Sequence, residues 1–439
     1  AVKSAVSGKA PDEDVGGARS RMSALDLASA YLSYVKQMIL EQSNLEVDPD
    51  EPLEVMVAVP AQSSSRQRYL TMEAFRRAGF QLLGLLNEPT AAALEYAHHS
   101  PRSLSARSPK SYVVVYDLGG GTFDTAAVSL KNQSFELISS EGVSSLGGND
   151  FDDLIAGSVL SECGIAGLAD TDYIRLLERC RRAKESLLLT SRRILIDTSE
   201  ILEEDEVVLS LGVIESLCEP LIEKTIESVR ALFENLRKQG IDPDNTRELG
   251  AVYLVGGSVN FPPVLKRLRR EFGRKLQLAP QSHASTAVGL AIAADSDSGV
   301  AIREASTRHF GVWREGADGV EKIFDPILDR HSGLQEGNPL KVERVYHPAH
   351  SVGCLRFVEC TQLDHMHTPG GEVTPWDHVL FPYDPELKKE EDLHLFLEAK
   401  ADAAKWQEIV ETYDYEPNGL IRVAIENRTS GYRREYILE

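Results

Sequence analysis

Three consecutive glycines between two apolar runs are the feature that most restricts how this chain can fold. Residues 111–116 and 123–130 are predicted strands, and Gly119, Gly120 and Gly121 lie in the turn between them. Glycine lets a backbone turn tightly and approach a ligand without a Cβ clash. Successive N–H groups of such a turn can also converge on a phosphate chain. A plain glycine-rich hairpin turn is the alternative that the three glycines alone leave open.

Polar residues next to these glycines favour a phosphate site over a plain turn. Asp117 ends the first strand and could hold a hydrated Mg²⁺, which takes only one or two carboxylates and keeps several waters. Thr122 can donate a hydrogen bond to a phosphate oxygen, and Asp124 follows two residues later. The set predicts a nucleotide site at the end of this strand.

Two more glycine pairs and one acid are candidates for the same site. They are Gly147-Gly148 and Gly256-Gly257, the second followed by Ser258 directly after the predicted strand 251–255. Each pair alone is more typical of a turn, but together they suggest several strand ends that meet around one nucleotide. Glu88 is a second acidic candidate, although an acid before Pro89 also simply suits a helix start.

The pattern of the chain changes near residue 295. Before it, helical and strand-like segments alternate, whereas short alternating runs dominate after residue 307 and predict an all-β part. We therefore expect domains at 1–294 and 307–439, joined by a polar linker at 295–306. The predicted helices are 21–42, 66–78, 90–97, 172–189, 213–238, 262–272 and 284–294. The predicted strands of the first part are 54–59, 111–116, 123–130, 134–140, 193–197, 206–211 and 251–255, and those of the second are 309–314, 321–324, 341–346, 352–359, 378–382, 408–414 and 420–426.

Composition excludes several classes of function. The net charge of -21 argues against nucleic acid or an anionic membrane as the main partner, because phosphates would be repelled. No apolar run approaches the roughly 18–20 residues that cross a bilayer. Five cysteines without a paired spacing suit the reducing cytoplasm. His347, His350, Cys354 and Cys360 could bind zinc, but their spacing matches no common set of ligands.

Five short motifs, in this order, resemble the Hsp70 family of chaperones. They are Val-Ala-Val-Pro-Ala at 57–61, Asn-Glu-Pro-Thr-Ala-Ala-Ala at 87–93, Asp-Leu-Gly-Gly-Gly-Thr-Phe-Asp at 117–124, Leu-Gly-Gly-Asn-Asp-Phe-Asp at 146–152 and Leu-Val-Gly-Gly-Ser at 254–258. No single motif is specific, but the ordered set is. The resemblance covers about 21–294 and continues more faintly to 415–427.

The resemblance implies an α/β actin-like ATPase domain built from ribonuclease H-like repeats, followed by an all-β sandwich that grips extended polypeptides. It implies ATP or ADP with Mg²⁺ as cofactors, and J-domain and nucleotide-exchange proteins as partners. Phosphoryl transfer to water would rest on positioning and electrostatics.

The resemblance also assigns roles to individual residues. Catalytic roles fall on Asp117, Glu88 and Thr122, with Asp117 holding Mg²⁺ through water and Asp124 ordering these ligands. Pro60 and Arg68 would couple nucleotide state to substrate release. The nucleotide would be bound by Gly119, Gly120, Gly121, Thr122, Gly147, Gly148, Lys184, Gly256, Gly257 and Ser258, with Lys184 reaching the ribose region.

Several features depart from the family pattern. The first phosphate loop of the family would lie before Ala1, so we expect a truncated N-terminus and an incomplete first repeat. On the adenine side, Arg181, Leu188, Asn260 and His283 replace an acid, a serine, an arginine and an aspartate. The linker is polar, and we expect no helical lid over the β part. These departures keep two alternatives open: a nucleotide-binding scaffold with little turnover and a dedicated partner, and a small-molecule kinase on the same fold.

Overall fold

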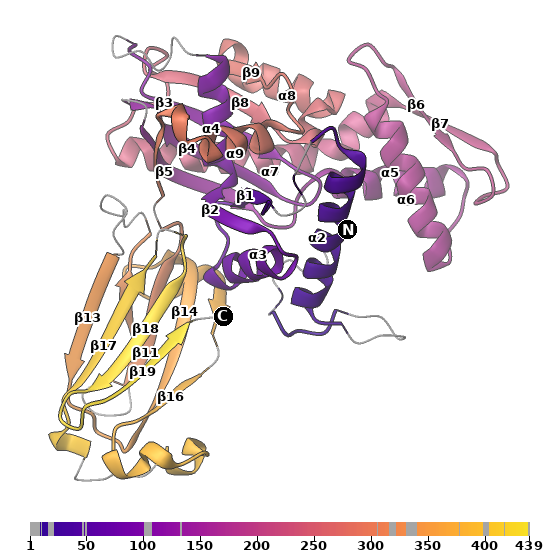
Figure 1. The fold of residues 1–439 in the computed structure, drawn as a ribbon. Helices are drawn as coiled ribbons and strands as arrows, with labels where there is room; N and C mark the ends of the chain where they lie inside the picture. The colour runs from indigo at the N-terminus through magenta and orange to yellow at the C-terminus, as the bar shows by residue number, and fades with distance from the viewer. Residues whose placement is uncertain are drawn as a thin grey trace. The chain divides into compact units, whose positions relative to one another are not determined.

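The chain divides into two compact units in a computed structural model (Figure 1). Unit 1 combines Ala1–Leu86 with Arg303–Glu439, and unit 2 is Asn87–Ile302. The predicted domain boundaries at 294 and 307 stay predictions. The structure describes residues 9, 11–15, 22–45, 48, 51–100, 108–131, 134–304, 306–315, 322–330, 340–376, 378–397, 404–416 and 418–437.

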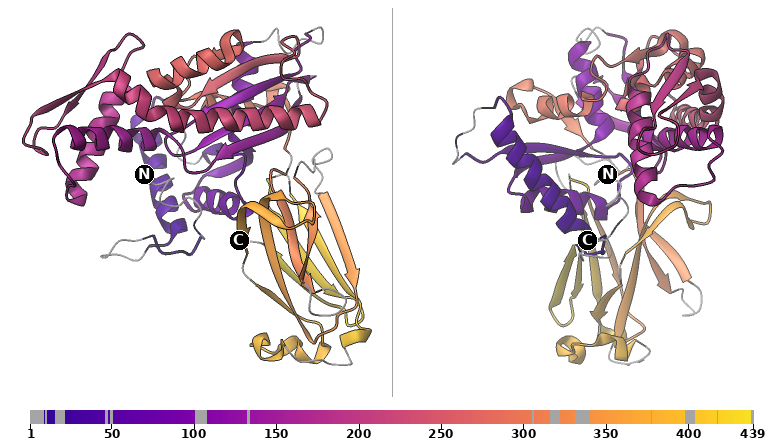
Figure 2. Two further views of the ribbon diagram at one scale, coloured as in Figure 1. Left: turned by 180° about the vertical axis from the view of Figure 1, so that it is seen from behind. Right: turned by 90° about the vertical axis from the view of Figure 1, so that its right-hand side faces the viewer.

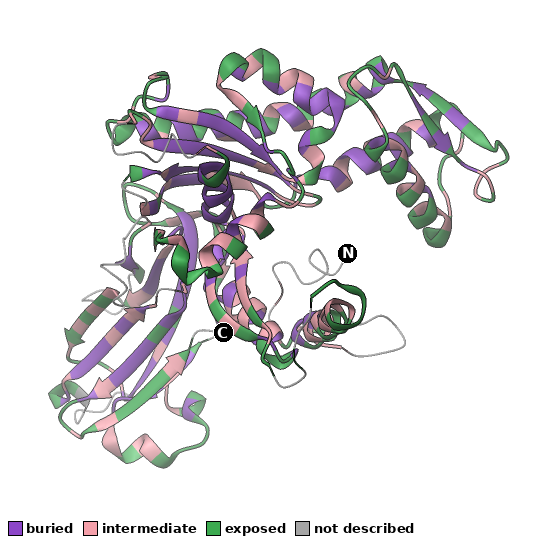
Figure 3. Ribbon diagram, turned by 45° about the horizontal axis from the view of Figure 1, so that its top comes forward, coloured by how far each residue is buried: buried purple, intermediate pink, exposed green. Residues whose placement is uncertain are grey.

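A six-stranded sheet forms the centre of unit 2. Its order is β10 (Ala301–Arg303), β5 (Ser134–Val143), β4 (Phe123–Ser129), β3 (Tyr112–Leu118), β8 (Leu249–Val255) and β9 (Leu276–Leu278). Strands β3, β4 and β5 form an antiparallel meander, while β3, β8 and β9 run parallel. Strand β3 is buried on both sides, as expected of a strand covered by helices on both faces (Figure 3).

Helices cover the two faces of this sheet. Helix α7 (Leu211–Lys238) lies along one face, where the Tyr116 hydroxyl is 2.7 Å from Thr225 Oγ1 (Figure 2). Helix α4 (Glu88–His99) lies on the other face, where the Tyr253 hydroxyl donates to Glu95. The other elements of unit 2 are α5 (Gly148–Glu162), α6 (Asp170–Glu185), the β6–β7 hairpin (Arg193–Asp197 and Glu206–Ser210), η3 (Gly257–Asn260), α8 (Pro262–Phe272), η4 (Gly273–Lys275), α9 (Ser285–Ala294) and η5 (Ser296–Ser298).

Among its described residues, the N-terminal part of unit 1 contains two helices and a two-stranded sheet. These are α2 (Ala24–Gln42), β1 (Glu54–Val59), α3 (Ser65–Arg77) and β2 (Gln81–Asn87). Helix α3 begins with a capping box, in which Ser64 accepts from the Gln67 N–H and Gln67 accepts from the Ser64 N–H. After α3, Gly79 adopts a φ of +80°. This left-handed conformation ends the helix, and glycine adopts it at a lower free-energy cost than other residues do.

Two antiparallel sheets form the rest of unit 1. One has the order β12 (Lys322–Leu328), β11 (His309–Glu315), β14 (Val352–Leu363) and β15 (Pro369–Pro375), with β16 (Val379–Pro382) on β14. The other has the order β13 (Leu340–Tyr346), β17 (Ile409–Tyr415), β18 (Ile421–Asn427) and β19 (Tyr432–Ile437). Their inner faces share one core, in which Phe310, Phe357 and Tyr413 contact one another. Three short helices complete the unit: η6 (Pro385–Lys389), η7 (Leu393–Phe396) and η8 (Ala404–Trp406).

The mixed α/β architecture with several sheets agrees with the coarse fold class expected from the sequence, and each predicted helix and strand overlaps an observed one. Elements β2, α5, β9, β10, β15 and β19 were not assigned from the sequence. Helix α5 begins inside a glycine pair that is typical of a turn, β15 contains two prolines and two glycines, and β19 is a charged edge strand. Among the described residues, no helix is long and apolar enough to span a membrane.

The crossing of α4 and α9 gives a first test of this fold. A Cβ on Gly289 would lie 1.8 Å from the Ala91 carbonyl oxygen, so Gly289→Ala must push the two helices apart. We expect a loss of about 1–3 kcal/mol in the free energy of unfolding and faster hydrogen exchange in α4 and α9, measured by mass spectrometry. Gly157→Ala in α5 is the control, since nothing lies within 4 Å of its added Cβ. If the amides of α4 and α9 are equally protected from hydrogen exchange in the two variants, the two helices do not cross this closely.

Candidate functional site

Three glycine segments of unit 2 meet at the ends of β3 and β8. The Gly148 N–H donates to the Gly119 carbonyl at 2.9 Å, and the Asn149 N–H donates to the Gly120 carbonyl at 2.7 Å. Ser258 Oγ, which follows the third segment, donates to the same Gly119 carbonyl at 2.9 Å. The sequence reading placed these segments around one ligand, and the structure brings them into direct contact.

Close backbone approach explains several of these glycines. A Cβ on Gly147 would lie 2.6 Å from backbone atoms of Gly120 and Gly121, and one on Gly148 would lie 2.3 Å from Ser258 Oγ. Gly256 has a φ of +88°, and a Cβ there would lie 2.3 Å from the Leu118 carbonyl oxygen. Any side chain at these positions would separate the segments.

Other glycines of the site are not required by packing. A Cβ on Gly257 would meet no atom within 4 Å, and one on Gly120 would meet only Asn149 Oδ1, at 3.8 Å. Both residues are exposed. A phosphate chain can approach backbone N–H groups closely only where no side chain stands in the way. Gly120 and Gly257 meet this condition and therefore fit the nucleotide that the sequence implies.

A buried ion pair holds the Gly147-Gly148 segment. Lys184 is 6% exposed, and its Nζ donates to the Gly148 carbonyl and lies 2.7 Å from Asp152 Oδ1. Burial raises the pKa of the Asp152 carboxyl, while the hydrogen bond from Lys184 opposes the shift. The Lys184 side chain is therefore held against the backbone of the Gly147-Gly148 segment.

Two of the residues that depart from the family pattern, Asn260 and Arg181, bond to neighbouring segments. Asn260 Nδ2 donates to Ser282 Oγ at 2.8 Å and to the Gly257 carbonyl at 3.3 Å. Arg181 donates to Asn149 Oδ1 at 2.8 Å. Leu188 is 68% exposed. Asn260 thus braces the third glycine segment, in a position where the family resemblance implies an arginine.

The acidic candidates lie at the ends of two elements of unit 2, and Asp117 borders the glycine segments. Asp117 is the penultimate residue of β3, directly opposite Asp124 on β4. A Cβ on Gly256 would lie 2.6 Å from Asp117 Oδ1, so this carboxylate borders the third glycine segment. Glu88 is the first residue of α4. Together with bare backbone N–H groups and Thr122, such carboxylates are suited to holding a hydrated divalent cation beside a phosphate chain.

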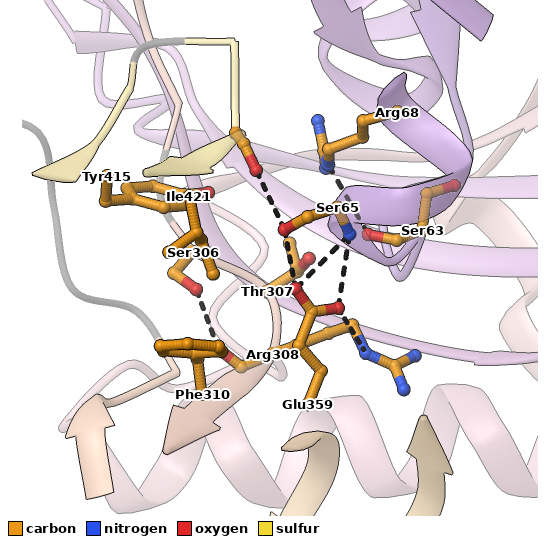
Figure 4. A pocket seen from close by; sticks show the side chains of 11 residues that line it. Ser63, Ser65, Arg68, Ser306, Thr307, Arg308, Phe310, Glu359, Tyr415 and Ile421 are labelled. Carbon is orange, nitrogen blue, oxygen red and sulfur yellow. Dashed lines mark hydrogen bonds and ion pairs between the residues drawn. The ribbon is translucent and has the colours of Figure 1, made fainter. Parts of the chain in front are cut away.

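A second constellation lies in unit 1, where α3 meets the β-sheets (Figure 4). Ser65, the first residue of α3, donates to the Glu359 carboxylate on β14 from both its N–H, at 3.1 Å, and its hydroxyl. The carboxylate therefore caps the helix N-terminus, where a negative charge is favourable. Arg308 Nε lies 3.7 Å from the same carboxylate.

The two predicted coupling residues belong to this region. Arg68 on α3 is 4% exposed, its Nε donates to the Ser63 carbonyl at 3.4 Å, and its side chain lies against Gly419. Gly419 has a φ of +80°, so a side chain there would be strained as well as blocked. Pro60 directly follows β1 and begins the segment that leads into α3, and its carbonyl accepts from the Ser63 N–H at 3.0 Å.

Sequence reasoning missed Ser65, Arg308 and Glu359. The available signals were an acid inside the long apolar strand 352–363 and the capping-box spacing at Ser64, neither of which identifies a partner hundreds of residues away. The zinc alternative finds no support among the described residues, where no cluster of His, Cys, Asp or Glu could hold a metal ion. His347 instead contacts the Gln407 carbonyl, and His350 contacts Glu315.

Comparison with known proteins identifies the family to which the chain belongs. A family model described as Hsp70 protein matches residues 9–307, which is more than half of the chain. The chain belongs to the Hsp70 family.

Similar curated proteins carry the name Chaperone protein HscA homolog. One from Cupriavidus necator is 35% identical over 228 residues, which cover 51% of this chain and 34% of the relative. One from Burkholderia mallei is 33% identical over 251 residues, which cover 56% of this chain and 38% of the relative. The chain thus spans little more than a third of the length of these relatives.

The Glu359 network predicts a measurable effect on stability. Glu359→Ala leaves the Ser65 N–H without its acceptor and Arg308 without this carboxylate, so we expect unit 1 to lose about 2–4 kcal/mol. Glu359→Gln keeps an acceptor for Ser65 and should lose less. Urea unfolding followed by tryptophan fluorescence reports on this unit selectively, because Trp313, Trp376 and Trp406 all lie in it.

The same variants also test a pH dependence. Burial raises the pKa of the Glu359 carboxyl above its ordinary value of 4.5, against the lowering effects of Arg308 and Ser65. A raised folded-state pKa stabilises the fold below 4.5 and loses that contribution as pH rises through the raised value. This loss should be absent in Glu359→Gln. Exposed Glu343→Ala is the control, and an unchanged pH profile in Glu359→Gln would contradict the assignment.

Proposed function

We propose that the chain is the nucleotide-binding and substrate-binding part of a chaperone that binds extended polypeptides under the control of ATP. The observation that carries the proposal is the direct contact among the three glycine segments, since packing does not account for bare backbone at Gly120 and Gly257. The sheet order of unit 2 is compatible with one ribonuclease H-like half of an actin-like ATPase.

Named residues would hold the nucleotide and its metal. Gly119, Gly120, Gly121 and Thr122 would donate to the phosphates, and Asp117 would orient water bound to Mg²⁺. Bound Mg²⁺ supplies positive charge against the phosphate oxygens. Glu88 would position a water, with Asp124 ordering Asp117 across the β3–β4 pair. The other binding residues in the proposal are Gly147, Gly148, Gly256, Gly257, Ser258 and Lys184, the last acting through the Gly148 carbonyl.

The β-rich part of unit 1 would bind the polypeptide, and α3 would link it to the nucleotide part. Glu359 caps α3 inside unit 1, which gives Pro60 and Arg68 a rigid connection to the β-sheets. We place the protein in the cytoplasm, with J-domain and nucleotide-exchange proteins as expected partners. A linker at 295–306 between a nucleotide domain and a β domain belongs to this proposal.

A scaffold that binds nucleotide with little turnover is the second candidate. The bonding of Asn260 to Ser282 and of Arg181 to Asn149 favours it, because these residues replace the groups that family members present to the adenine side. Loss of a guanidinium stacked on a base removes about 1–3 kcal/mol of binding. In that case, the β-rich part would serve one dedicated protein partner.

Release of a fluorescent unfolded peptide, timed with and without Mg-ATP, tests the proposal. ATP should speed release, and Asp117→Asn should weaken the response to Mg²⁺ by about 10- to 100-fold, as loss of a group that orients metal ligands does. Asp205→Asn in the exposed β6–β7 turn should match the parent chain. Peptide binding that ignores ATP in every variant would favour the scaffold, and absence of any peptide binding would refute the substrate role.

A further inference from the structure

An apolar groove of about 460 Å³ lies on the sheet β12-β11-β14-β15 of unit 1. It is lined by Trp313, Lys322, Arg356, Phe357, Val358, Pro375, Trp376 and His378. The groove lies apart from the constellation around Glu359, with which it shares no lining residue. No residue of the nucleotide site lines it.

Register explains the aromatic floor of the groove. Trp313 on β11 lies directly opposite Phe324 on β12 and Arg356 on β14, so the three share the outer face of the sheet. The rings of Trp313 and Phe324 meet edge to face, with centroids 5.4 Å apart. Gly311 makes room for this floor, since a Cβ there would lie 2.5 Å from the Phe324 ring.

Trp376 forms a wall of the groove and carries an unsatisfied donor. It is 5% exposed, and its indole N–H has no hydrogen-bond partner among the described residues. Buried indole N–H groups normally have an acceptor. This nitrogen is covered by the protein, so a bound segment would contact the groove beside the ring and not the N–H itself. The Arg66 guanidinium lies over the ring, 5.4 Å from its centroid.

Two cations flank the apolar floor without partners of their own. Lys322 and Arg356 are both exposed, and neither side chain has an ion pair or hydrogen bond with another described residue. Glu315 lies opposite Lys322 in the register, but its carboxylate is bound by His350 Nε2 at 2.9 Å. Among the described residues, none that lines the groove is acidic. The two cations therefore outnumber the one carboxylate opposite Lys322, in a chain whose net charge is -21.

The side chains that line the groove indicate which kind of molecule would bind there. Tryptophan and arginine are the residues that most often dominate binding energy at protein interfaces. The apolar floor accommodates a few aliphatic or aromatic side chains, and the two cations favour carboxylates beside them. Single-stranded nucleic acid also stacks on tryptophan, but two cations are few against a polyphosphate that the rest of the chain repels.

We propose that this groove, lined by Trp313 and Trp376 between Lys322 and Arg356, docks an extended polypeptide segment in which apolar residues are flanked by acidic ones. The inference rests on the proposed binding of polypeptides by the β-rich part and adds its place and the sequence class it prefers. Binding here does not require nucleotide.

Fluorescence anisotropy of short labelled peptides on the full chain tests the proposal. One peptide has a Leu-Phe-Leu core between blocks of glutamate, and matched peptides carry lysine or serine in place of glutamate. The glutamate peptide should bind at least about tenfold more tightly than the lysine peptide, and the difference should shrink at high salt. Because these peptides contain no tryptophan, a change in intrinsic fluorescence in a Trp406→Phe background reports on Trp313 and Trp376 of the groove.

Charge reversal locates the site. Lys322→Glu with Arg356→Glu should weaken the glutamate peptide by about tenfold or more and improve the lysine peptide. Lys341→Glu with Arg433→Glu is the control, with the same change in net charge on exposed residues of the other sheet. The milder pair Lys322→Gln and Arg356→Gln serves if the reversal unfolds the unit, as judged by circular dichroism.

Each outcome separates this inference from the function it rests on. If all peptides bind equally and the reversal changes nothing, the groove proposal is wrong while polypeptide binding stands. If no peptide binds, both fail. If an oligothymidylate binds and the peptides do not, the groove is a nucleic-acid site and the proposal is overturned.

Discussion

The close approach of three backbone segments is the constraint on which the candidate nucleotide site depends. Gly147 and Gly256 are positions where a single methyl group would overlap backbone atoms of the β3–β4 turn. Hydrogen bonds to the Gly119 and Gly120 carbonyls then fix the segments against one another. Most of these contacts are made by backbone atoms, so they constrain the path of the chain. Neighbouring side chains can therefore differ from the family pattern, as Asn260 and Arg181 do.

A different principle organises the junction between α3 and the β-sheets of unit 1. There a carboxylate, Glu359, is buried at a helix N-terminus and bound by Ser65, while Arg308 is anchored by the Gln62 and Glu372 carbonyls at 3.0 Å each. Such a network favours one docking geometry, because each displaced partner would leave a buried polar group unsatisfied. The helix that carries Arg68 is thereby fixed to the β-rich part.

The sequence predicted the elements with strong periodicity and the residues with local steric roles. The amphipathic pattern of 213–238 located α7, and the glycine motifs located the segments that meet at β3 and β8. It could not separate Gly147, which packing requires, from Gly257, which faces open space. It also could not find the contact between Ser65 and Glu359, because that pair depends on how distant elements pack and leaves no spacing signal.

The distribution of charge links these observations to binding. Elsewhere in the chain, many cationic side chains form ion pairs with acidic ones. Arg267 on α8, for example, pairs with Glu219 and Glu223 on α7 and with Glu271 on its own helix. Lys322 and Arg356 differ, because neither side chain has an ion pair with another described residue. Both border the groove that the half-buried ring of Trp313 lines. An acidic, apolar segment would pair with the two cations and cover the apolar lining at the same time.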